Sequence, residues 1–180
     1  MRSLKIILLA FLFALVLGLA GCGGHATATP QPTPTPVLIE QWASAAEASS
    51  EFAWPDWSAL QVLGEPDVTQ CEDDPHAWAS ARGNGLEWLE LTFAQPVYPR
   101  ELRIHQVIGR GAIARVLVRD EAGELQLLWE GEDIGDTCPG VLRIPLPRTA
   151  YRVTRVRIEI DESRTGFWDL IDAVQLIGEK

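Results

Sequence analysis

The chain has 180 residues, of which 15 are basic and 25 are acidic, and its net charge is −10 at neutral pH. Binding to phosphate backbones needs a footprint of lysine and arginine, so this balance argues against a nucleic-acid partner. It also argues against docking on anionic lipid through a basic face.

The first predicted element is an export signal. Arg2 and Lys5 flank the start of an apolar run over residues 6–20, which is shorter than the roughly 20 residues that a membrane-spanning helix needs. A positive start, an apolar middle and small residues before a cut site predict a signal peptide over residues 1–21. The alternatives are an uncleaved N-terminal anchor helix and a signal whose product carries no lipid.

The end of this signal, Leu19-Ala20-Gly21-Cys22, resembles the lipobox of bacterial lipoproteins. The resemblance implies that Cys22 is the lipid attachment site and carries a fatty acyl group such as palmitate. It further implies an extracytoplasmic protein anchored at the cell membrane, or at the outer membrane of a cell that has two.

A tether follows over residues 22–36, where threonine and proline alternate. Such a sequence favours extended polyproline II and cannot bury a core. Cleavage after residue 21 removes two of the 15 basic residues and none of the 25 acidic ones, so the mature net charge is −12. With so acidic a chain, we expect membrane lipid to hold the protein only through acylated Cys22.

Residues 37–180 have the size of a single domain. Residues 56–63 predict one short helix that ends before Gly64. Alternation of apolar and polar residues predicts strands over 87–93, 101–107, 114–120, 125–129, 142–146, 152–160 and 167–177. Residues 121–124 make a hairpin turn, Pro145 marks an edge strand, and a slip near Thr154 marks a bulge. Many short strands predict an all-β antiparallel sandwich or jelly roll.

Three stretches carry a family resemblance. Residues 46–52 (AEASSEF), 88–97 (WLELTFAQPV) and 168–178 (WDLIDAVQLIG) resemble the galactose-binding-like jelly rolls related to discoidin and F5/8 type C domains. The resemblance covers about residues 42–178. It implies about eight antiparallel strands, often a structural calcium ion, and ligands held by loops at one end. Members of this family bind sugars, phospholipid head groups or proteins.

The remaining cysteines form a predicted pair. With Cys22 used for lipid attachment, Cys71 and Cys138 are left, and paired cysteines outside the cytoplasm usually form a disulfide. Two free thiols or a pair of metal ligands are the alternatives.

Acidic residues crowd the loop around Cys71, namely Glu65, Asp67, Glu72, Asp73 and Asp74. Oxygen clusters of this kind suit a hard cation. The family resemblance implies a calcium ligand from the closing strand, where Ala173 stands and Asp172 lies adjacent. Asp67 and Asp172 are therefore the candidate calcium ligands, and a solvated acidic loop is the alternative.

Three loops are candidates for ligand contacts. In the loop 52–57, Trp54 and Trp57 can stack on the C–H face of a sugar, or they plug the end of the sandwich as core. The loop 105–112 contributes His105 and Arg110, and the loop 161–167 contributes Arg164, since guanidinium groups fork onto carboxylates and hydroxyl pairs. The other tryptophans are expected to be packing residues, namely Trp42, Trp78, Trp88, Trp129 and Trp168.

Catalytic motifs give no support for an enzyme. The sequence contains no G-x-S-x-G, H-E-x-x-H or P-loop pattern. We therefore expect a non-catalytic, membrane-anchored binding module whose ligand is carbohydrate. The alternative is a protein-interaction module of a cell-envelope assembly.

Overall fold

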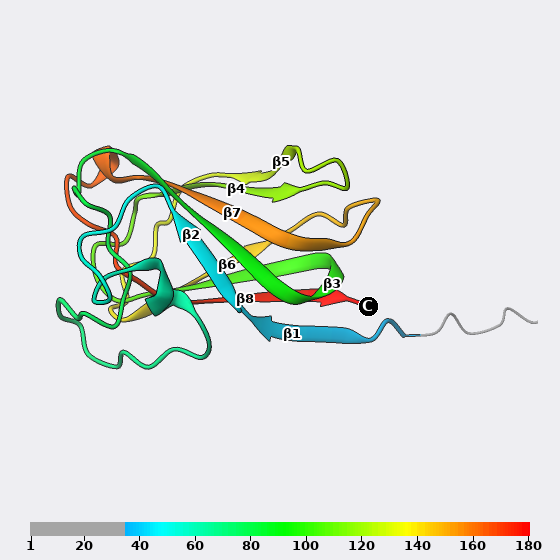
Figure 1. The fold of residues 1–180 in the computed structure, drawn as a ribbon, viewed down its shortest axis with the longest axis horizontal. Coiled ribbons are helices and arrows are strands. Elements are labelled where there is room, and N and C mark those ends of the chain that lie inside the picture. Colours follow the sequence, from blue (N-terminus) through cyan, green and yellow to red (C-terminus); the bar gives the residue numbers. More distant parts are fainter. Residues whose placement is uncertain (1–34) are drawn as a thin grey trace, which may run out of the picture. The chain divides into compact units, whose positions relative to one another are not determined.

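The computed structural model describes residues 35–180. The predicted signal peptide, Cys22 and most of the tether lie outside the described residues. The described chain is almost entirely strand and loop (Figure 1). Its strands are β1 (Leu38–Trp42), β2 (Ala45–Ala48), β3 (Leu86–Gln106), β4 (Ile113–Arg119), β5 (Leu125–Glu130), β6 (Gly140–Pro145), β7 (Val153–Asp161) and β8 (Ile171–Glu179).

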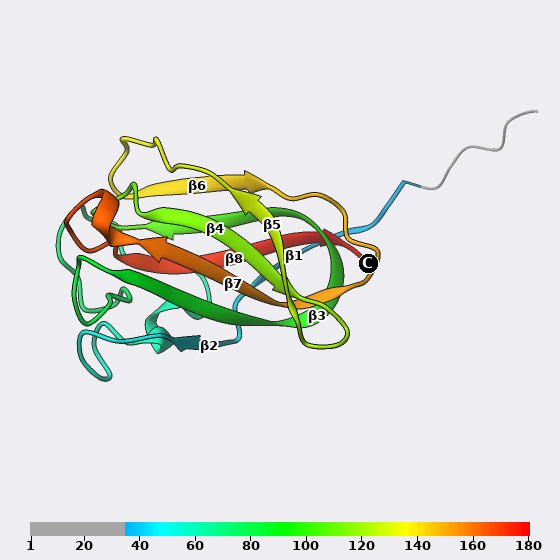
Figure 2. The same ribbon diagram turned by 90° about the horizontal axis from the view of Figure 1, so that it is seen from above.

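All strand pairings are antiparallel, and they form two groups that share β3. One group runs β1-β8-β3-β6, and the other runs β2-β3-β7-β4-β5. The two groups are the layers of a sandwich: in Figure 1 strands β4, β5 and β7 lie above β6, β8 and β1, and in Figure 2, seen from above, the two layers overlap. The predicted all-β antiparallel fold with eight strands is confirmed, and so are the β4–β5 hairpin and the edge position of Pro145 in β6.

Strand β3 connects the two layers, and here the prediction of two separate strands was wrong. Residues 86–92 of β3 pair with β7, and residues 101–106 pair with β6 and β8. Register shifts fall between Thr92 and Val97 and between Pro99 and Glu101. The sequence alternation breaks at this bend, because β-bulges interrupt the pleat without ending the chain's extended course.

The predicted helix is also shorter than expected. Of the stretch 56–63 only Ala59–Val62 is helical, as a 3-10 turn, and a second 3-10 turn, Glu162–Arg164, follows β7. The Ser58 side chain caps the first of these turns by accepting a hydrogen bond from the backbone N–H of Leu60 at 3.3 Å. Within residues 35–180, no helix is long and apolar enough to cross a membrane.

The core lies between the two layers and is built from the inward residues of the strands. Leu89, Leu91, Leu102 and Ile158 are among its fully buried side chains. A second, smaller cluster of buried residues lies apart from this core and consists of Val68, Ala77, Ala79, Val107 and Leu170. The loops gather at one end of the sandwich, on the left in Figure 1, whereas the start of β1 and the C-terminus lie at the other end.

Candidate functional site at the loop end

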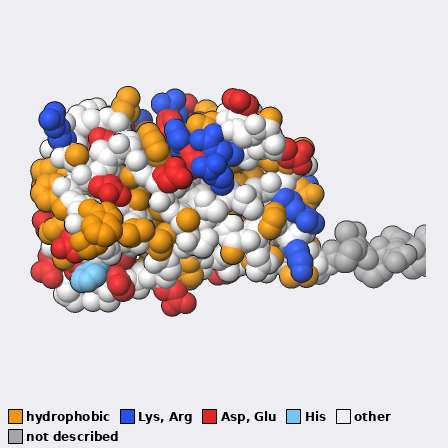
Figure 3. Space-filling view, in the orientation of Figure 1, with side chains coloured by type: hydrophobic (Ala, Val, Ile, Leu, Met, Phe, Trp, Pro, Cys, Tyr) orange, Lys and Arg blue, Asp and Glu red, His pale blue; other side chains and the backbone are white. Residues whose placement is uncertain are grey.

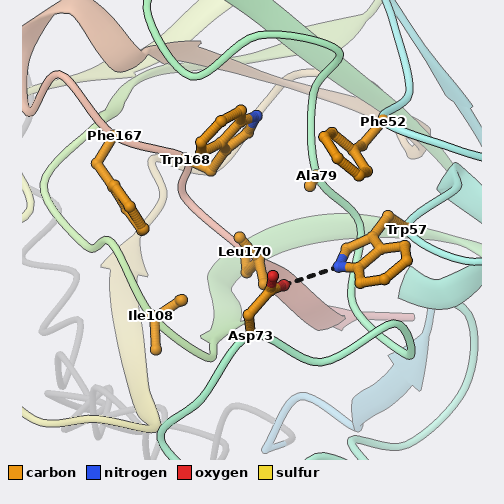
Figure 4. Close-up of a pocket in the computed structure, with 8 residues that line it drawn as sticks. All are labelled: Phe52, Trp57, Asp73, Ala79, Ile108, Phe167, Trp168 and Leu170. Atoms are coloured by element: carbon orange, nitrogen blue, oxygen red, sulfur yellow. Dashed lines mark hydrogen bonds between the residues drawn. The ribbon is translucent and has the colours of Figure 1, made fainter.

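A hollow of about 250 Å³ lies among the loops, above the second apolar cluster. All three loops that the sequence singled out reach it: the first with Phe52 and Trp57, the second with Ile108 and the third with Phe167. The full lining, drawn in Figure 4, is Phe52, Trp57, Asp73, Ala79, Ile108, Phe167, Trp168 and Leu170. We call this feature the aromatic hollow.

Four rings in the wall of the aromatic hollow contact one another edge to face. The ring centroids of Phe167 and Trp168 are 5.7 Å apart, those of Trp168 and Phe52 are 6.0 Å apart, and those of Phe52 and Trp57 are 5.5 Å apart. Such T-shaped contacts are the preferred geometry of aromatic pairs. Phe52 and Phe167 are nevertheless 54% and 46% exposed, so the rings present apolar surface to a ligand.

Trp57 is held in an unusual backbone conformation. Its φ of 54° lies in the left-handed region, which a bulky residue rarely adopts and which costs free energy. Two backbone hydrogen bonds secure it, one from Trp57 N–H to the carbonyl of Pro75 at 2.9 Å and one from Ala79 N–H to the carbonyl of Trp57 at 3.1 Å. Strained residues cluster at functional sites, and this one directs its ring into the hollow.

Asp73 is the one charged residue in the lining. Its Oδ1 accepts a hydrogen bond from Trp57 Nε1 at 2.9 Å, which Figure 4 shows as a dashed line. The segment that carries Asp73 is fastened by the Cys71–Cys138 disulfide, which confirms the predicted pairing. One carboxylate among apolar walls supplies a hydrogen-bond acceptor at the edge of the hollow.

Trp168 was expected to be a packing residue, but it lines the hollow. Its Nε1 donates to the carbonyl of Ser80 at 3.0 Å. Gly109, with a φ of 78°, lies so close behind it that a Cβ there would stand 1.7 Å from the Trp168 carbonyl oxygen. The close approach requires glycine at this position. The pair Gly109–Trp168 therefore fixes the loops 105–112 and 161–170 against each other.

The other residues predicted to contact ligand lie elsewhere. Trp54 is 73% exposed, outside the lining of the hollow. Arg164 donates to the carbonyl of Gly131 at 3.0 Å. The His105 ring packs against Trp42 at 5.3 Å, on β3. Burial and the neighbouring guanidinium groups of Arg143 and Arg103 lower the pKa of His105.

Arg110 is largely buried in an ion pair with Asp133. Its Nη2 and Nε lie 2.7 and 3.0 Å from the two carboxylate oxygens, and its Nη1 donates to Thr137 Oγ1 at 3.0 Å. Burial opposes ionisation of Asp133, but the hydrogen bonds from Arg110 and Gln106 prevail and lower its pKa. The guanidinium therefore braces the loop 131–139.

Two further carboxyl groups lie buried behind the wall of the hollow. Asp169 is fully buried, and neither of its carboxyl oxygens accepts a hydrogen bond from the described residues. Burial raises its pKa well above the usual range, and the nearby charges of Asp133 and Glu162 raise it further. Burial likewise raises the pKa of Glu162, which accepts from Ser80 Oγ at 2.7 Å. Neither Asp169 nor Glu162 is among the residues that line the hollow.

The candidate calcium ligands Asp67 and Asp172 are neighbours. The Asp172 carboxylate accepts the backbone N–H groups of Asp67 at 3.4 Å and Val68 at 3.3 Å. Burial raises the pKa of Asp172 to about 6 despite these bonds. Within residues 35–180, no group of three or more His, Cys, Asp or Glu side chains is arranged to hold a metal ion. Calcium binding stays a prediction, which thermal melts with calcium and with a chelator test.

Residues 35–180 match one family model, which is described as "Pappalysin-1, SD scarf domain, C-terminal". No curated protein matches the sequence.

Solved structures with the same fold include several carbohydrate-binding modules. One is a truncated AlyQ with CBM32 and alginate lyase domains, at a TM-score of 0.59 and 16% identity, covering 81% of this chain and 35% of that one. A chitosan-binding module from a Paenibacillus sp. IK-5 chitosanase/glucanase has a TM-score of 0.54 and 15% identity over 73% of this chain and 92% of its own. The family 32 module of Streptococcus pneumoniae EndoD has a TM-score of 0.56 and 14% identity over 78% and 99%. This chain thus spans about a third of the truncated AlyQ and nearly all of the isolated modules.

Proposed function

The chain belongs to the family of the pappalysin-1 SD scarf domain, C-terminal region, and on this fold we propose a non-catalytic carbohydrate-binding module that uses the aromatic hollow. The observation that carries the proposal is the arc of four rings beside one carboxylate. Ligand sites are concave, mostly apolar and carry few polar groups. The C–H face of a sugar covers an aromatic ring, and its hydroxyl groups donate to Asp73.

The fold supports this choice of ligand class. Structures of the same architecture are described as modules that bind chitosan or belong to carbohydrate-binding family 32. The hollow lies at the loop end, and the resemblance to galactose-binding-like jelly rolls points to loops at one end of the sandwich.

We further propose that acylated Cys22 anchors the module in a membrane. The described chain enters the domain at β1, at the end opposite the loops (Figure 1). The point at which the anchored segment joins the domain and the aromatic hollow are therefore at opposite ends of the domain, so an anchor leaves the hollow open to glycans. Mass spectrometry of the membrane-extracted protein tests the anchor: an acylated N-terminal peptide starting at Cys22 supports it, and an unmodified one refutes it.

The test of carbohydrate binding is a glycan array probed with the purified protein, followed by titration of the best glycan against tryptophan fluorescence. Trp57 and Trp168 lie in the hollow, so a bound sugar shifts or quenches the emission. If no glycan changes the signal and a pull-down recovers an envelope protein instead, the interaction-module alternative replaces the proposal.

A further inference from the structure

A second hollow adjoins the aromatic hollow at Trp168. It has a volume of about 340 Å³, and its lining is Ala81, Arg82, Gly83, Asn84, Gly166 and Trp168. Because Trp168 also lines the aromatic hollow, the two hollows meet at this residue. In Figure 4, Trp168 lies at the side of the aromatic hollow opposite Asp73. We call the second feature the side hollow.

The loop that lines the side hollow packs directly against Trp168. A Cβ added at Gly83 would stand 2.7 Å from the backbone nitrogen of Trp168 and 2.8 Å from its Cδ2 atom, so this close approach requires glycine. Trp168 Nε1 donates to the carbonyl of Ser80 at 3.0 Å. The backbone N–H of Asn84 donates to the carbonyl of Arg82 at 2.9 Å. The loop is therefore ordered before a ligand arrives, which lowers the cost of binding.

Arg82 brings unused hydrogen-bond donors to the side hollow. It is exposed, and Arg82 and Arg152 are the arginines within residues 35–180 that form no salt bridge. Arg152 instead lies over the Tyr98 ring, 5.6 Å from its centroid. A guanidinium group carries five N–H donors and no acceptor. The partner that suits Arg82 is therefore a ligand with oxygen acceptors.

No acidic side chain among the described residues lines the side hollow. The carboxyl groups on neighbouring segments have other partners. Glu162 accepts from Ser80 Oγ at 2.7 Å, and Glu87 accepts from Ser50 Oγ at 2.8 Å. Asn84 is exposed and adds a side-chain amide, which both donates and accepts. On the face that Figure 3 shows, hydrophobic and acidic side chains predominate at the loop end, on the left, so the side hollow adds donors to an end that is otherwise apolar and acidic.

We propose that the side hollow is a second subsite, so that the ligand is an oligosaccharide of at least two rings rather than a single sugar. This inference rests on the proposed binding of carbohydrate in the aromatic hollow. One ring packs there, with its hydroxyl groups donating to Asp73. The next ring passes Trp168, and its oxygens accept hydrogen bonds from Arg82 and Asn84. A hydroxyl oxygen accepts as well as donates, so neutral sugars suit both subsites.

Four pairs of a monosaccharide and its disaccharide test the proposal: galactose with galactobiose, glucose with cellobiose, mannose with mannobiose, and N-acetylglucosamine with chitobiose. Each sugar is titrated into the purified protein against tryptophan fluorescence. In at least one pair, the disaccharide should bind at least fivefold more tightly than the monosaccharide, because it reaches both hollows. A smaller gain in every pair overturns the proposal. Absence of binding in all pairs also overturns it, and the glycan array then decides separately whether the aromatic hollow binds other carbohydrate.

Variants assign the gain to the side hollow. Arg82→Ala should raise the Kd of the disaccharide at least fivefold and leave that of the monosaccharide within twofold. The loop should persist in this variant, because Asn84 N–H bonds to the backbone carbonyl of residue 82, and an unchanged Tm checks this.

Arg143→Ala is the matched control, because Arg143 is 59% exposed at its side chain, lies on β6 and lines neither hollow. A disaccharide Kd that Arg82→Ala leaves unchanged, or a rise of the same size in the control, overturns the proposal. Phe52→Ala should weaken the monosaccharide and the disaccharide alike, which separates failure of the second subsite from failure of the aromatic hollow.

Discussion

Replacement of Cys71 and Cys138 by serine removes the covalent tie between two loops at the functional end. The cysteines are 67 positions apart, and the chain-entropy relation for a loop of that size gives about 4.4 kcal/mol at 25 °C. For a domain of about 146 residues, an unfolding entropy of roughly 2.1 cal/mol/K per residue converts this loss into a fall in Tm of about 14 °C. We expect the double-serine variant to fold with the lower Tm.

Calorimetric melts of the wild type and the variant measure this effect, and melts with dithiothreitol provide the internal control. The reductant should lower the Tm of the wild type to that of the variant and leave the variant unchanged. Because the bridge also fastens the segment that carries Asp73, glycan affinity should fall in the same variant. A fall in Tm of less than about 4 °C, or a wild type that dithiothreitol does not affect, would refute the reasoning.

Three further predictions concern Asp172, Asp169 and Gly109. Burial raises the pKa of Asp172 from 3.8 to about 6, so the folded protein holds this proton to a higher pH than the unfolded chain does. The free energy of unfolding of the wild type minus that of Asp172→Asn should therefore fall by about 3 kcal/mol as the pH rises from about 4 to 6, because all other carboxyl groups titrate in both proteins; a difference that stays constant or rises in urea titrations would contradict this. Asp169→Asn should raise the free energy of unfolding by more at pH 7.5 than at pH 5, because the amide cannot ionise in its buried site, and an equal effect at both values counts against a buried carboxyl there. Gly109→Ala should lower the free energy of unfolding by at least about 2 kcal/mol, since a Cβ would stand 1.7 Å from the Trp168 carbonyl oxygen; a variant as stable as the wild type in urea would show that the loops are not packed this closely.

Most of the strands could be predicted because the alternation of apolar and polar residues is a local signal. The disulfide could be predicted from the number of cysteines that remain once Cys22 is assigned to lipid attachment. The alternation at 114–120 and 152–160 reports which side chains face the core, and a single pair of cysteines leaves one pairing. The continuous course of β3 escaped prediction, because a bulge looks like a strand end in the sequence. Similarly, only part of the stretch 56–63 forms a helical turn, because the N-cap is Ser58 and the turn therefore begins at Ala59.

The site could be predicted at the level of loops but not of side chains. Arg110 stands in a loop bracketed by glycines, yet its partner Asp133 comes from a segment 23 positions away, which no local pattern reveals. Trp168 looked like strand packing, although its place directly after a candidate loop and next to Phe167 was a usable signal. Asp73 was read as one of several loop carboxylates, and its contact with Trp57 Nε1 appears only in three dimensions.

We propose that the aromatic hollow, rather than exposed aromatic surface in general, binds carbohydrate. Phe52 and Trp54 offer a matched comparison: both belong to one loop and are exposed by 54% and 73%, and only Phe52 lines the hollow. The most direct measurement is the Kd of Phe52→Ala and Trp54→Ala for the best array glycan. Phe52→Ala should raise the Kd at least tenfold, about 1.4 kcal/mol, and Trp54→Ala should change it less than twofold. A large effect of Trp54→Ala alone, or no effect of Phe52→Ala, would contradict it.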